Sequence, residues 1–239
     1  GLLVVTEGRN STTRTLAGLD VQSMAYPHHA LATRIRLEQP HAATAWQWFG
    51  GDSILGLLPM GGPDGHEMAV VWSQPAAQAM AWRQASPEAL ADAISEASAR
   101  QLGQVQVTSA VATWPLVLSR ATRWVGDGVV LAGDAAHTLH PLAGQGLNLG
   151  LGDVAELTQV LRERESWRSV GDSRLLRRYE RARHWPTRTM QLATDALFLA
   201  FESRWPLMAP LRNVGMQWFD RMGPIKQWAM AQARRAESN

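Results

Sequence analysis

The sequence of 239 residues contains no cysteine, and Lys226 is its only lysine. The absence of cysteine excludes disulfides and cysteine-ligated metal sites, and it fits a reducing compartment such as the cytoplasm. No run of 18 or more apolar residues occurs, so hydropathy predicts no transmembrane helix. No basic segment precedes an apolar core near Gly1, and we therefore expect no signal peptide.

Charge of either sign is also scarce. Charged residues make up 18% of the chain, and 23 basic against 21 acidic residues give a net charge of +2. So small an excess gives no argument for a nucleic-acid partner, and we expect none. Hydrophobic residues make up 46% of the chain, which is typical of a folded globular protein and not of a disordered one.

One stretch has the pattern of a strand, an acidic turn, a loop and a helix. Val129 to Ala132 is a short apolar run between two glycines, which predicts a buried strand. Asp134 then lies at the carboxyl end of this strand, where open α/β sheets place their ligands. A helix is predicted from about Leu147, because five apolar residues recur at helical spacing: Leu147, Leu151, Val154, Ala155 and Leu157. The free N–H groups and the dipole at the start of such a helix favour an anionic or electron-rich group.

The full string GDAAHTLHPLAGQGLNLGLGD is more specific than its glycines alone. It resembles the second flavin-binding motif of the class A FAD-dependent aromatic monooxygenases, the group of para-hydroxybenzoate hydroxylase. Within that group it is most similar to the ubiquinone-biosynthesis hydroxylases. The alternative is an ordinary strand–loop–helix connection whose glycines serve only the turn.

The resemblance implies which residues bind the flavin. Asp134, with Gly133, would contact the ribityl or pyrophosphate region. The isoalloxazine ring would be held at the start of the helix by a longer set: Pro141, Gly144, Gln145, Gly146, Leu147 and Asn148. Glu7 and Gly8 lie in a stretch similar to the family's Asp-Gly motif, but Glu7 stands where the family has Asp. An ordinary polar turn after a strand is the alternative for Glu7.

The resemblance also implies the chemistry. FAD would be reduced by NAD(P)H and would form a C4a-hydroperoxide that hydroxylates an aromatic ring, so we expect no catalytic side chain. The substrate would be a polyprenylated phenol, a precursor of ubiquinone.

A metal site is the competing interpretation of the same stretch. Asp134, His137 and His140 form a D-x-x-H-x-x-H pattern with suitable ligands for zinc or iron. The two histidines lie in a predicted loop, and the chain has no second cluster of this kind, so we expect no metal. Nucleophilic hydrolysis is disfavoured because the chain has no G-x-S-x-G motif and no cysteine.

Residues 18–118 are predicted to form an antiparallel sheet with one helix. The expected strands are Ala30–Leu37, Thr44–Phe49, Ile54–Leu58, Met68–Trp72 and Val105–Leu116. Ser86 and Pro87 predict the start of a helix. The resemblance makes this block the substrate domain, with Leu58, Pro59 and Trp72 as pocket residues. The alternative for each of these three is a place in the hydrophobic core.

Beyond residue 165 the sequence predicts helices, with Pro186 kinking or ending the first of them. An amphipathic stripe follows, formed by Leu207, Leu211, Val214, Trp218 and Met222. The basic tail at 225–239 is expected to contact a ubiquinone-biosynthesis assembly or a membrane surface. Packing of these helices on the same protein is the alternative. We expect a cytoplasmic protein peripheral to the inner membrane.

The predicted class is therefore α/β in the mixed α+β sense. Residues 1–17 and 119–165 would be the distal part of an FAD/NAD(P)-binding fold, and residues 166–239 a helical region. The family's amino-terminal G-x-G-x-x-G unit does not occur in this sequence. We therefore expect a fragment of a longer hydroxylase that is inactive alone. The alternative is a non-catalytic protein-interaction module that keeps the hydroxylase fold.

Overall fold

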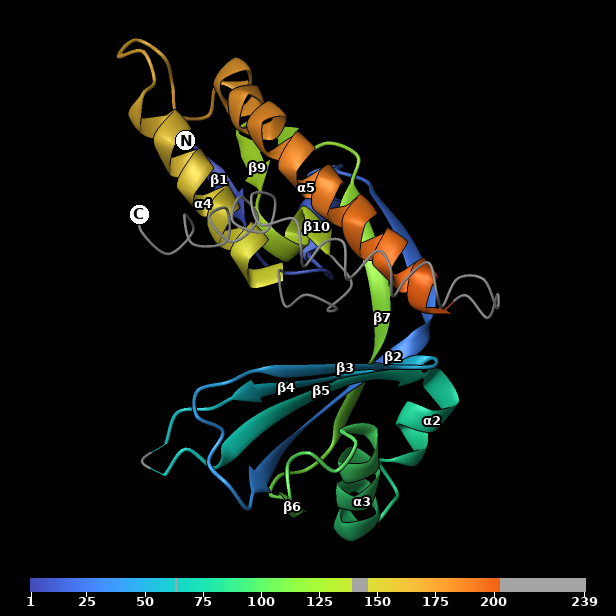
Figure 1. Ribbon diagram of the computed structural model, residues 1–239. Helices are drawn as coiled ribbons and strands as arrows, with labels where there is room; N and C mark the ends of the chain where they lie inside the picture. Colours follow the sequence, from blue (N-terminus) through green and yellow to red (C-terminus); the bar gives the residue numbers. More distant parts are fainter. Residues whose placement is uncertain (63, 139–145, 203–239) are drawn as a thin grey trace. The chain divides into compact units, whose positions relative to one another are not determined.

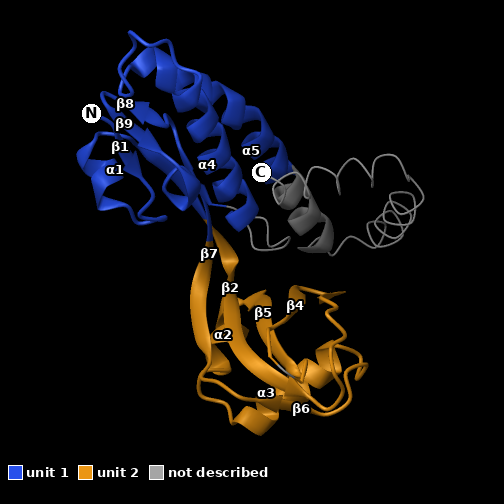
Figure 2. Cartoon of the chain, turned by 90° about the vertical axis from the view of Figure 1, so that its left-hand side faces the viewer, with its two compact units in different colours: residues 1–24, 117–239 blue, residues 25–116 orange. Residues whose placement is uncertain are grey.

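The computed structural model describes residues 1–62, 64–138 and 146–202, with side chains for all of these except 193–202. The chain forms two compact units, one of residues 1–24 and 117–239 and one of residues 25–116. Figure 1 shows the elements in chain order, and Figure 2 colours the two units. Strands β2 (Val21–Leu37) and β7 (Ala112–Ala121) each contribute residues to both units.

The first unit contains a three-stranded sheet with two long helices. The strand order is β1 (Leu3–Val5), β9 (Val129–Leu131) and β8 (Val125–Gly126), with β1 parallel to β9. Helices α4 (Gly146–Arg162) and α5 (Ser173–Glu202) run side by side (Figure 1). Their buried residues join the strands in one hydrophobic core, which includes Val5, Trp124, Val130, Leu131, Leu157, Val160, Leu175, Leu176 and Tyr179.

The apolar residues at the start of the chain form β1. Within the described residues it lies at the edge of its sheet, and its side chains Leu3 and Val4 are 50% and 42% exposed. Three short elements complete this unit: α1 (Thr12–Leu16), the 3-10 helix η1 (Gly133–Ala135) and β10 (His137–Thr138).

The second unit is the predicted antiparallel sheet. Strands β2, β5 (Glu67–Pro75), β4 (Ser53–Pro59) and β3 (Trp46–Gly50) follow one another in the ladder. Helix α3 (Pro87–Ala97) packs its Leu90 and Ile94 onto one face, in a core with Leu31, Ile35, Leu55, Leu57, Met68, Val70 and Trp72. The predicted start of α3 is confirmed, because Ser86 Oγ accepts a hydrogen bond of 3.2 Å from the N–H of Ala89.

Two details of this unit differ from the prediction. A second helix, α2 (Ala76–Ala81), follows β5 directly. The stretch expected as one strand is divided into β6 (Val105–Val107) and β7. The division lies at Ser109, whose hydroxyl accepts a 2.8 Å hydrogen bond from the N–H of Arg34 and also contacts the Thr33 hydroxyl. At this point the N–H of Arg34 donates to the side chain of Ser109 and not to a backbone carbonyl of a neighbouring strand.

Helix α5 does not end at Pro186, which lies inside it. A proline in a helix interior removes one hydrogen bond and crowds the preceding turn, a cost of roughly 3 kcal/mol. Buried side chains lie on both sides of it, Tyr179 before and Thr187 and Gln191 after. Packing of both halves on the same unit offsets the local cost. Of the two predicted effects of Pro186, kinking or ending the helix, the ending is therefore wrong.

Candidate functional site

The turn after β9 exposes a carboxylate at the carboxyl end of the strand. Gly133 has a φ of +61°, a left-handed conformation that glycine adopts without strain, and a Cβ there would meet nothing within 4 Å. The chain then enters η1, in which Asp134 is exposed. Asp134 therefore points away from the core, at the position that the sequence predicted for it.

Helix α4 begins against this turn. A Cβ on Gly150 would lie 3.5 Å from the Cα of Gly133, so the first turns of the helix closely approach the end of β9. The positive end of the α4 dipole therefore lies near the turn that carries Asp134. This arrangement can bind a ligand that carries both hydroxyl groups and partial negative charge.

A fully buried carboxylate holds the turn in place. Asp153, on α4, is 0% exposed, and its Oδ2 accepts hydrogen bonds from the N–H of Gly133 at 2.9 Å and from His137 Nε2 at 2.7 Å. Its Oδ1 accepts a 2.8 Å hydrogen bond from Arg183 Nε, on α5. One side chain thus joins the end of β9, strand β10 and both long helices.

The surroundings of Asp153 keep it ionised. Burial alone would raise its pKa, but the hydrogen bond and charge of His137 and the hydrogen bonds from Arg183 and Gly133 outweigh burial. The pKa of Asp153 consequently lies below its ordinary value. Arg183 also donates from Nη2 to the carbonyl of Leu149 at 3.0 Å, which ties α5 to α4 a second time.

His137 belongs to the buried hydrogen-bond network of Asp153. Its ring is 2% exposed and lies 5.1 Å, centroid to centroid, from the ring of Trp124. Trp124 in turn packs on Tyr179, whose hydroxyl donates to the carbonyl of Leu131 at 3.0 Å. Within the part of the chain that the structure describes, no group of three potential ligands is placed to hold a metal. His140, the third member of the predicted pattern, lies outside the described residues.

The remaining predicted flavin residues divide into two groups. Gly146 is the first residue of α4, Asn148 is half-buried, and Leu147 is 73% exposed. Pro141, Gly144 and Gln145 lie outside the described residues.

The predicted helix is confirmed as α4, but of the five apolar residues that indicated it, Leu157 is buried and the other four are exposed. Leu147, Leu151 and Val154 are 73%, 48% and 53% exposed. The buried face consists of Leu149, Asp153, Leu157 and Val160. Asp153 lies on this buried face, where it forms an ion pair with Arg183.

Glu7 caps helix α1. Its two carboxylate oxygens accept hydrogen bonds from the hydroxyls of Ser11 and Thr13, both at 2.6 Å, and from the N–H of Thr13 at 3.0 Å. The Ser11 hydroxyl, then those of Thr13, lower the pKa of Glu7 to about 2. Arg14, in the same helix, donates to the carbonyl of Ala135 at 2.9 Å, which connects the Glu7–Gly8 turn with the Asp134 turn.

The three predicted pocket residues of the second unit do not share a surface. Trp72 is 4% exposed and stacks on Trp82 in the hydrophobic core, with ring centroids 6.2 Å apart. Leu58, on β4, is 48% exposed, and the register pairs it with Ala69, whereas Trp72 pairs with Leu55. Because side chains alternate along strands, Leu58 and Trp72 point to opposite faces. Trp72 thus occupies the core, the alternative that the sequence left open.

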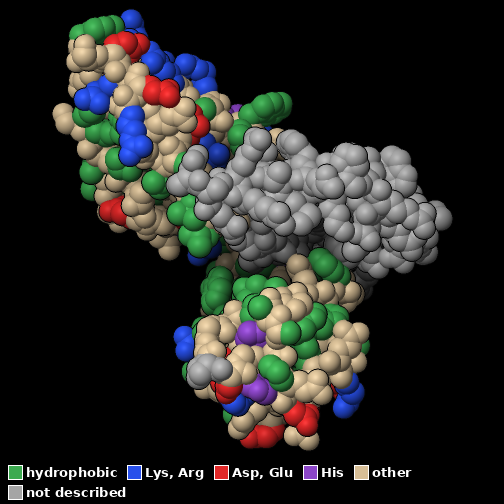
Figure 3. All heavy atoms as spheres, turned by 60° about the vertical axis from the view of Figure 1, so that its left-hand side comes forward, with side chains coloured by type: hydrophobic (Ala, Val, Ile, Leu, Met, Phe, Trp, Pro, Cys, Tyr) green, Lys and Arg blue, Asp and Glu red, His purple; other side chains and the backbone are tan. Residues whose placement is uncertain are grey.

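The face of the sheet that carries Leu58 is lined by small residues. The register places side by side Ala30, Ala32, Gly56, Ala69, Val71 and Ser73. The same register also places Arg34, Ile54 and Phe49 on this face. Ala30, Ile54 and Ser73 are buried, so part of the face is covered. In Figure 3, hydrophobic and histidine side chains gather on the visible face of the second unit, at the bottom of the view, while Lys and Arg gather on the first.

Sequence reasoning missed Asp153 and Arg183 as the residues that organise the site. One signal was present: Asp153 lies four residues after Leu149 and four before Leu157, so a carboxylate interrupts an apolar helical face. A charge at such a position needs a partner. The partner, Arg183, is 30 residues away in the sequence, and local spacing does not identify it.

Comparison with known proteins gives three findings. The family described as FAD binding domain matches residues 2–193. The 3-demethoxyubiquinol 3-hydroxylase of Escherichia coli is 31% identical over 97% of this chain and 59% of its own length. The ubiquinone biosynthesis monooxygenase COQ6 of Danio rerio is also 31% identical, over 96% of this chain and 54% of its own length. The chain thus spans little more than half the length of these relatives.

A solved structure supports the fold. The protein pqsL of Pseudomonas aeruginosa, described as a probable FAD-dependent monooxygenase, matches with a TM-score of 0.70 at 24% identity. The match covers 85% of this chain and 57% of that one. The predicted fold class, a mixture of helices and antiparallel sheet similar to FAD-dependent monooxygenases, is therefore confirmed.

Proposed function

Because the chain belongs to the FAD binding domain family, we propose that it forms the distal flavin site and the substrate sheet of an FAD-dependent aromatic hydroxylase. The predicted resemblance to the class A monooxygenases agrees with this family and with the ubiquinone hydroxylases among the relatives. The reaction proposed is hydroxylation of an aromatic ring in a ubiquinone precursor, with NAD(P)H as the reductant.

The observation that carries the proposal is the turn fixed by Asp153. It presents Asp134 as an exposed carboxylate at the end of β9, and none of the hydrogen bonds among the described residues uses this side chain. The open space above Gly133 leaves room for a ligand next to it. These features fit the hydroxyl-bearing ribityl chain of FAD, because a carboxylate accepts hydrogen bonds from hydroxyls.

Different residues of the chain would bind different parts of FAD. Asp134 would accept hydrogen bonds from the ribityl region, and the N–H groups of Gly146, Leu147 and Asn148 would face the electron-rich edge of the ring. Pro141, Gly144 and Gln145 would complete the loop before α4. Glu7 and Gly8 would contact the flavin from the turn after β1. The bound flavin would supply the oxygen chemistry.

The sheet face with Leu58 is proposed to contact the substrate. Its small residues, Ala32, Gly56 and Ala69, leave space for an aromatic ring beside Leu58. Trp72 is no longer part of this proposal, because it belongs to the opposite face. Pro59, which follows Leu58 on β4 and lies on the face of Trp72, is no longer part of it either.

The flavin site is tested with Asp134→Ala in the protein encoded by the complete reading frame. Loss of a hydrogen bond to a charged group costs about 1.5–3 kcal/mol, or roughly a tenfold to hundredfold loss of FAD affinity. The measurement is flavin absorbance per protein after purification, followed by FAD titration of the apoprotein. Asp127→Ala, another exposed aspartate of this unit, is the control and should retain FAD as the wild type does. Equal retention in both variants would remove Asp134 from the site.

The second candidate is a non-catalytic interaction module with the same fold. Such a module would lack a G-x-G-x-x-G unit throughout its complete reading frame. The DNA upstream of the Gly1 codon discriminates between the two. An in-frame G-x-G-x-x-G strand–turn–helix supports the hydroxylase, and a start codon at that point supports the module.

A separate proposal concerns the surface from which the protein takes up its substrate. In the described parts of the chain, none of the helices has the length and apolar character needed to span a bilayer. We propose that the basic segment 225–239, which lies outside the described residues with the stripe Leu207 to Met222, contacts a membrane surface or a biosynthetic assembly. Deleting 225–239 should weaken vesicle co-sedimentation or pathway pull-down while the protein stays folded. Unchanged binding, or unfolding, would contradict this.

A further inference from the structure

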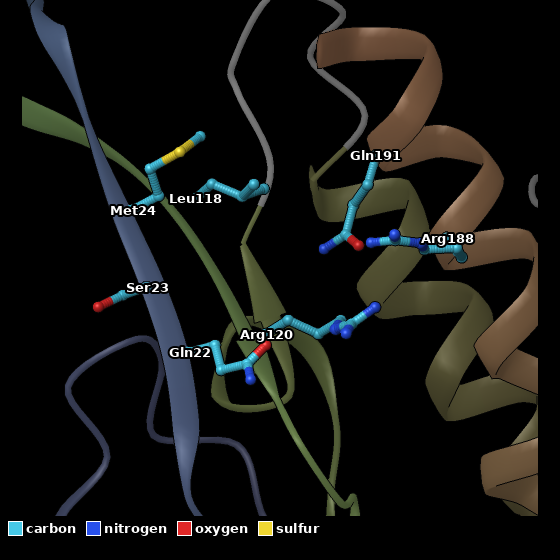
Figure 4. A pocket seen from close by; sticks show the side chains of 7 residues that line it. All are labelled: Gln22, Ser23, Met24, Leu118, Arg120, Arg188 and Gln191. Atoms are coloured by element: carbon cyan, nitrogen blue, oxygen red, sulfur yellow. The ribbon is translucent and has the colours of Figure 1, made fainter.

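A partly open pocket of about 190 Å³ lies within the first unit. Its lining comes from β2 (Gln22, Ser23, Met24), β7 (Leu118, Arg120) and α5 (Arg188, Gln191). Figure 4 shows Arg188 and Gln191 extending from α5 toward the strands, and Arg120 extending from β7 toward them. Three elements that are distant in the sequence thus direct polar side chains into one space.

The pocket concentrates positive charge without a counter-ion. Arg120 and Arg188 are both half-buried, and none of the lining residues is acidic. Three other arginines of this unit have carboxylate partners: Arg183 pairs with Asp153, Arg168 with Glu165 and Asp172, and Arg178 with Glu165. Neither Arg120 nor Arg188 forms an ion pair with any residue of the described ranges. Two guanidinium groups that face one cavity repel each other, and an anion between them removes that cost.

The buried face of α5 changes character where it reaches this pocket. Its first turns bury the apolar or aromatic residues Leu175, Leu176 and Tyr179. Its later turns bury Thr187 and Gln191, which are 1% and 2% exposed. The hydroxyl of Thr187 has no hydrogen-bond partner among the residues that the structure describes. Burying polar groups costs free energy unless they bind something polar.

We infer that this pocket is a binding site for a phosphate-type oxyanion. The guanidinium of arginine presents a planar fork of donors that matches the oxygens of phosphate, and Arg120 and Arg188 offer two such forks. The amides of Gln22 and Gln191 supply further donors at its walls. A cavity needs only about 10–15 Å³ to hold one water molecule, so the volume is sufficient for a phosphoryl group with water around it.

The phosphate group has two possible sources, free orthophosphate or pyrophosphate on one hand and a nicotinamide dinucleotide on the other. The inference does not depend on the proposed hydroxylase activity, because binding requires neither FAD nor turnover. Failure of either proposal therefore leaves the other intact.

The test is calorimetric titration of the purified 239-residue chain with pyrophosphate, orthophosphate and NADPH at constant ionic strength. Arg120→Gln and Arg188→Gln remove one charge each and should each weaken binding about tenfold or more. Arg181→Gln is the matched control: it removes the same charge from an exposed position on the same helix and should bind as the wild type does. Arg188→Lys keeps the charge but not the fork, and should bind between the wild type and Arg188→Gln.

The results assign the source as well. Tighter binding of NADPH than of pyrophosphate, lost in both glutamine variants, identifies a dinucleotide phosphate. Equal or tighter binding of the inorganic anions, with the same loss, identifies a free-phosphate site. The inference is overturned if no anion binds the wild type, or if Arg181→Gln weakens binding as much as the pocket variants. Circular dichroism confirms that each variant is folded, and the lysine variant keeps the test decisive if a glutamine variant is not.

Discussion

The N–H of Gly133 donates a 2.9 Å hydrogen bond to Oδ2 of Asp153, a residue 20 positions later. The same carboxylate accepts from His137 and Arg183, so the geometry of the exposed turn is set by a group in the interior. The turn needs a glycine for its positive φ, and the N–H of that glycine needs an acceptor. Asp153 is that acceptor, and α4 carries it to the end of β9.

Asp153→Asn should destabilise the protein strongly, although asparagine and aspartate side chains have the same shape. The variant leaves Arg183, with 12% of its side chain exposed, next to a neutral amide. Removing one partner of a buried ion pair costs about 3–5 kcal/mol, because the remaining charge stays buried. Urea unfolding of the two proteins, followed by circular dichroism, measures the difference.

Asp127→Asn makes the same chemical change at an exposed aspartate of the same unit. Its unfolding free energy should stay within about 0.5 kcal/mol of the wild type. A loss as small as this in Asp153→Asn would show that the buried network contributes little to stability.

Gly150 and Gly152, the two glycines in the interior of α4, should respond differently to substitution by alanine. In a helix interior, alanine is favoured over glycine by roughly 0.5–1 kcal/mol. A Cβ at Gly150 would meet only an ordinary contact of 3.5 Å, so Gly150→Ala should be neutral or stabilising. A Cβ at Gly152 would lie 2.9 Å from Nη2 and 3.1 Å from Cζ of Arg183. The arginine would have to move away from Asp153 and Leu149, so Gly152→Ala should be the less stable variant.

Thermal unfolding of the two alanine variants side by side gives the comparison. The order of stability, rather than either value alone, carries the conclusion. Gly152→Ala as stable as Gly150→Ala would mean that Arg183 can move without losing its hydrogen bonds.

Features decided by neighbouring residues could be predicted from the sequence. The start of α3 follows from the Ser86 hydroxyl and Pro87, and the strands of the second unit follow from alternation and glycine turns. The exposed position of Asp134 at a strand end was predicted for the same reason. In each case the determining contacts lie within a few residues.

Features decided by distant residues could not be predicted. The face that α4 buries includes Asp153, whose partner Arg183 lies on another helix. Helix α5 continues through Pro186 because later residues pack. Trp72 looked as suitable for a pocket as Leu58 did. Its face was determined by the register between strands and by its stacking on Trp82. Spacing along one strand gives alternation, but not which face the helix covers.

Glu7 gives a prediction for the dependence of stability on pH. Its pKa is lowered from 4.5 to about 2 in the folded protein by the hydroxyls of Ser11 and Thr13 and by the N–H of Thr13. A carboxylate with a depressed folded pKa contributes stability above its unfolded pKa, and this contribution is lost as the pH falls toward the folded value. The stability that Glu7 adds should therefore be constant above about pH 5 and should disappear progressively between pH 4.5 and 2.

The comparison is between the wild type and Glu7→Gln, by urea unfolding at intervals from pH 7 to pH 3. Glutamine keeps an acceptor oxygen but has no proton to take up, so the difference between the two proteins should shrink below pH 4.5. Thr13→Ala is the matched variant, because it keeps the carboxylate and removes one hydroxyl donor. It should show a smaller pH-dependent loss than the wild type. A difference between wild type and Glu7→Gln that stays constant down to pH 3 would mean that the cap on α1 does not depend on the charge of Glu7.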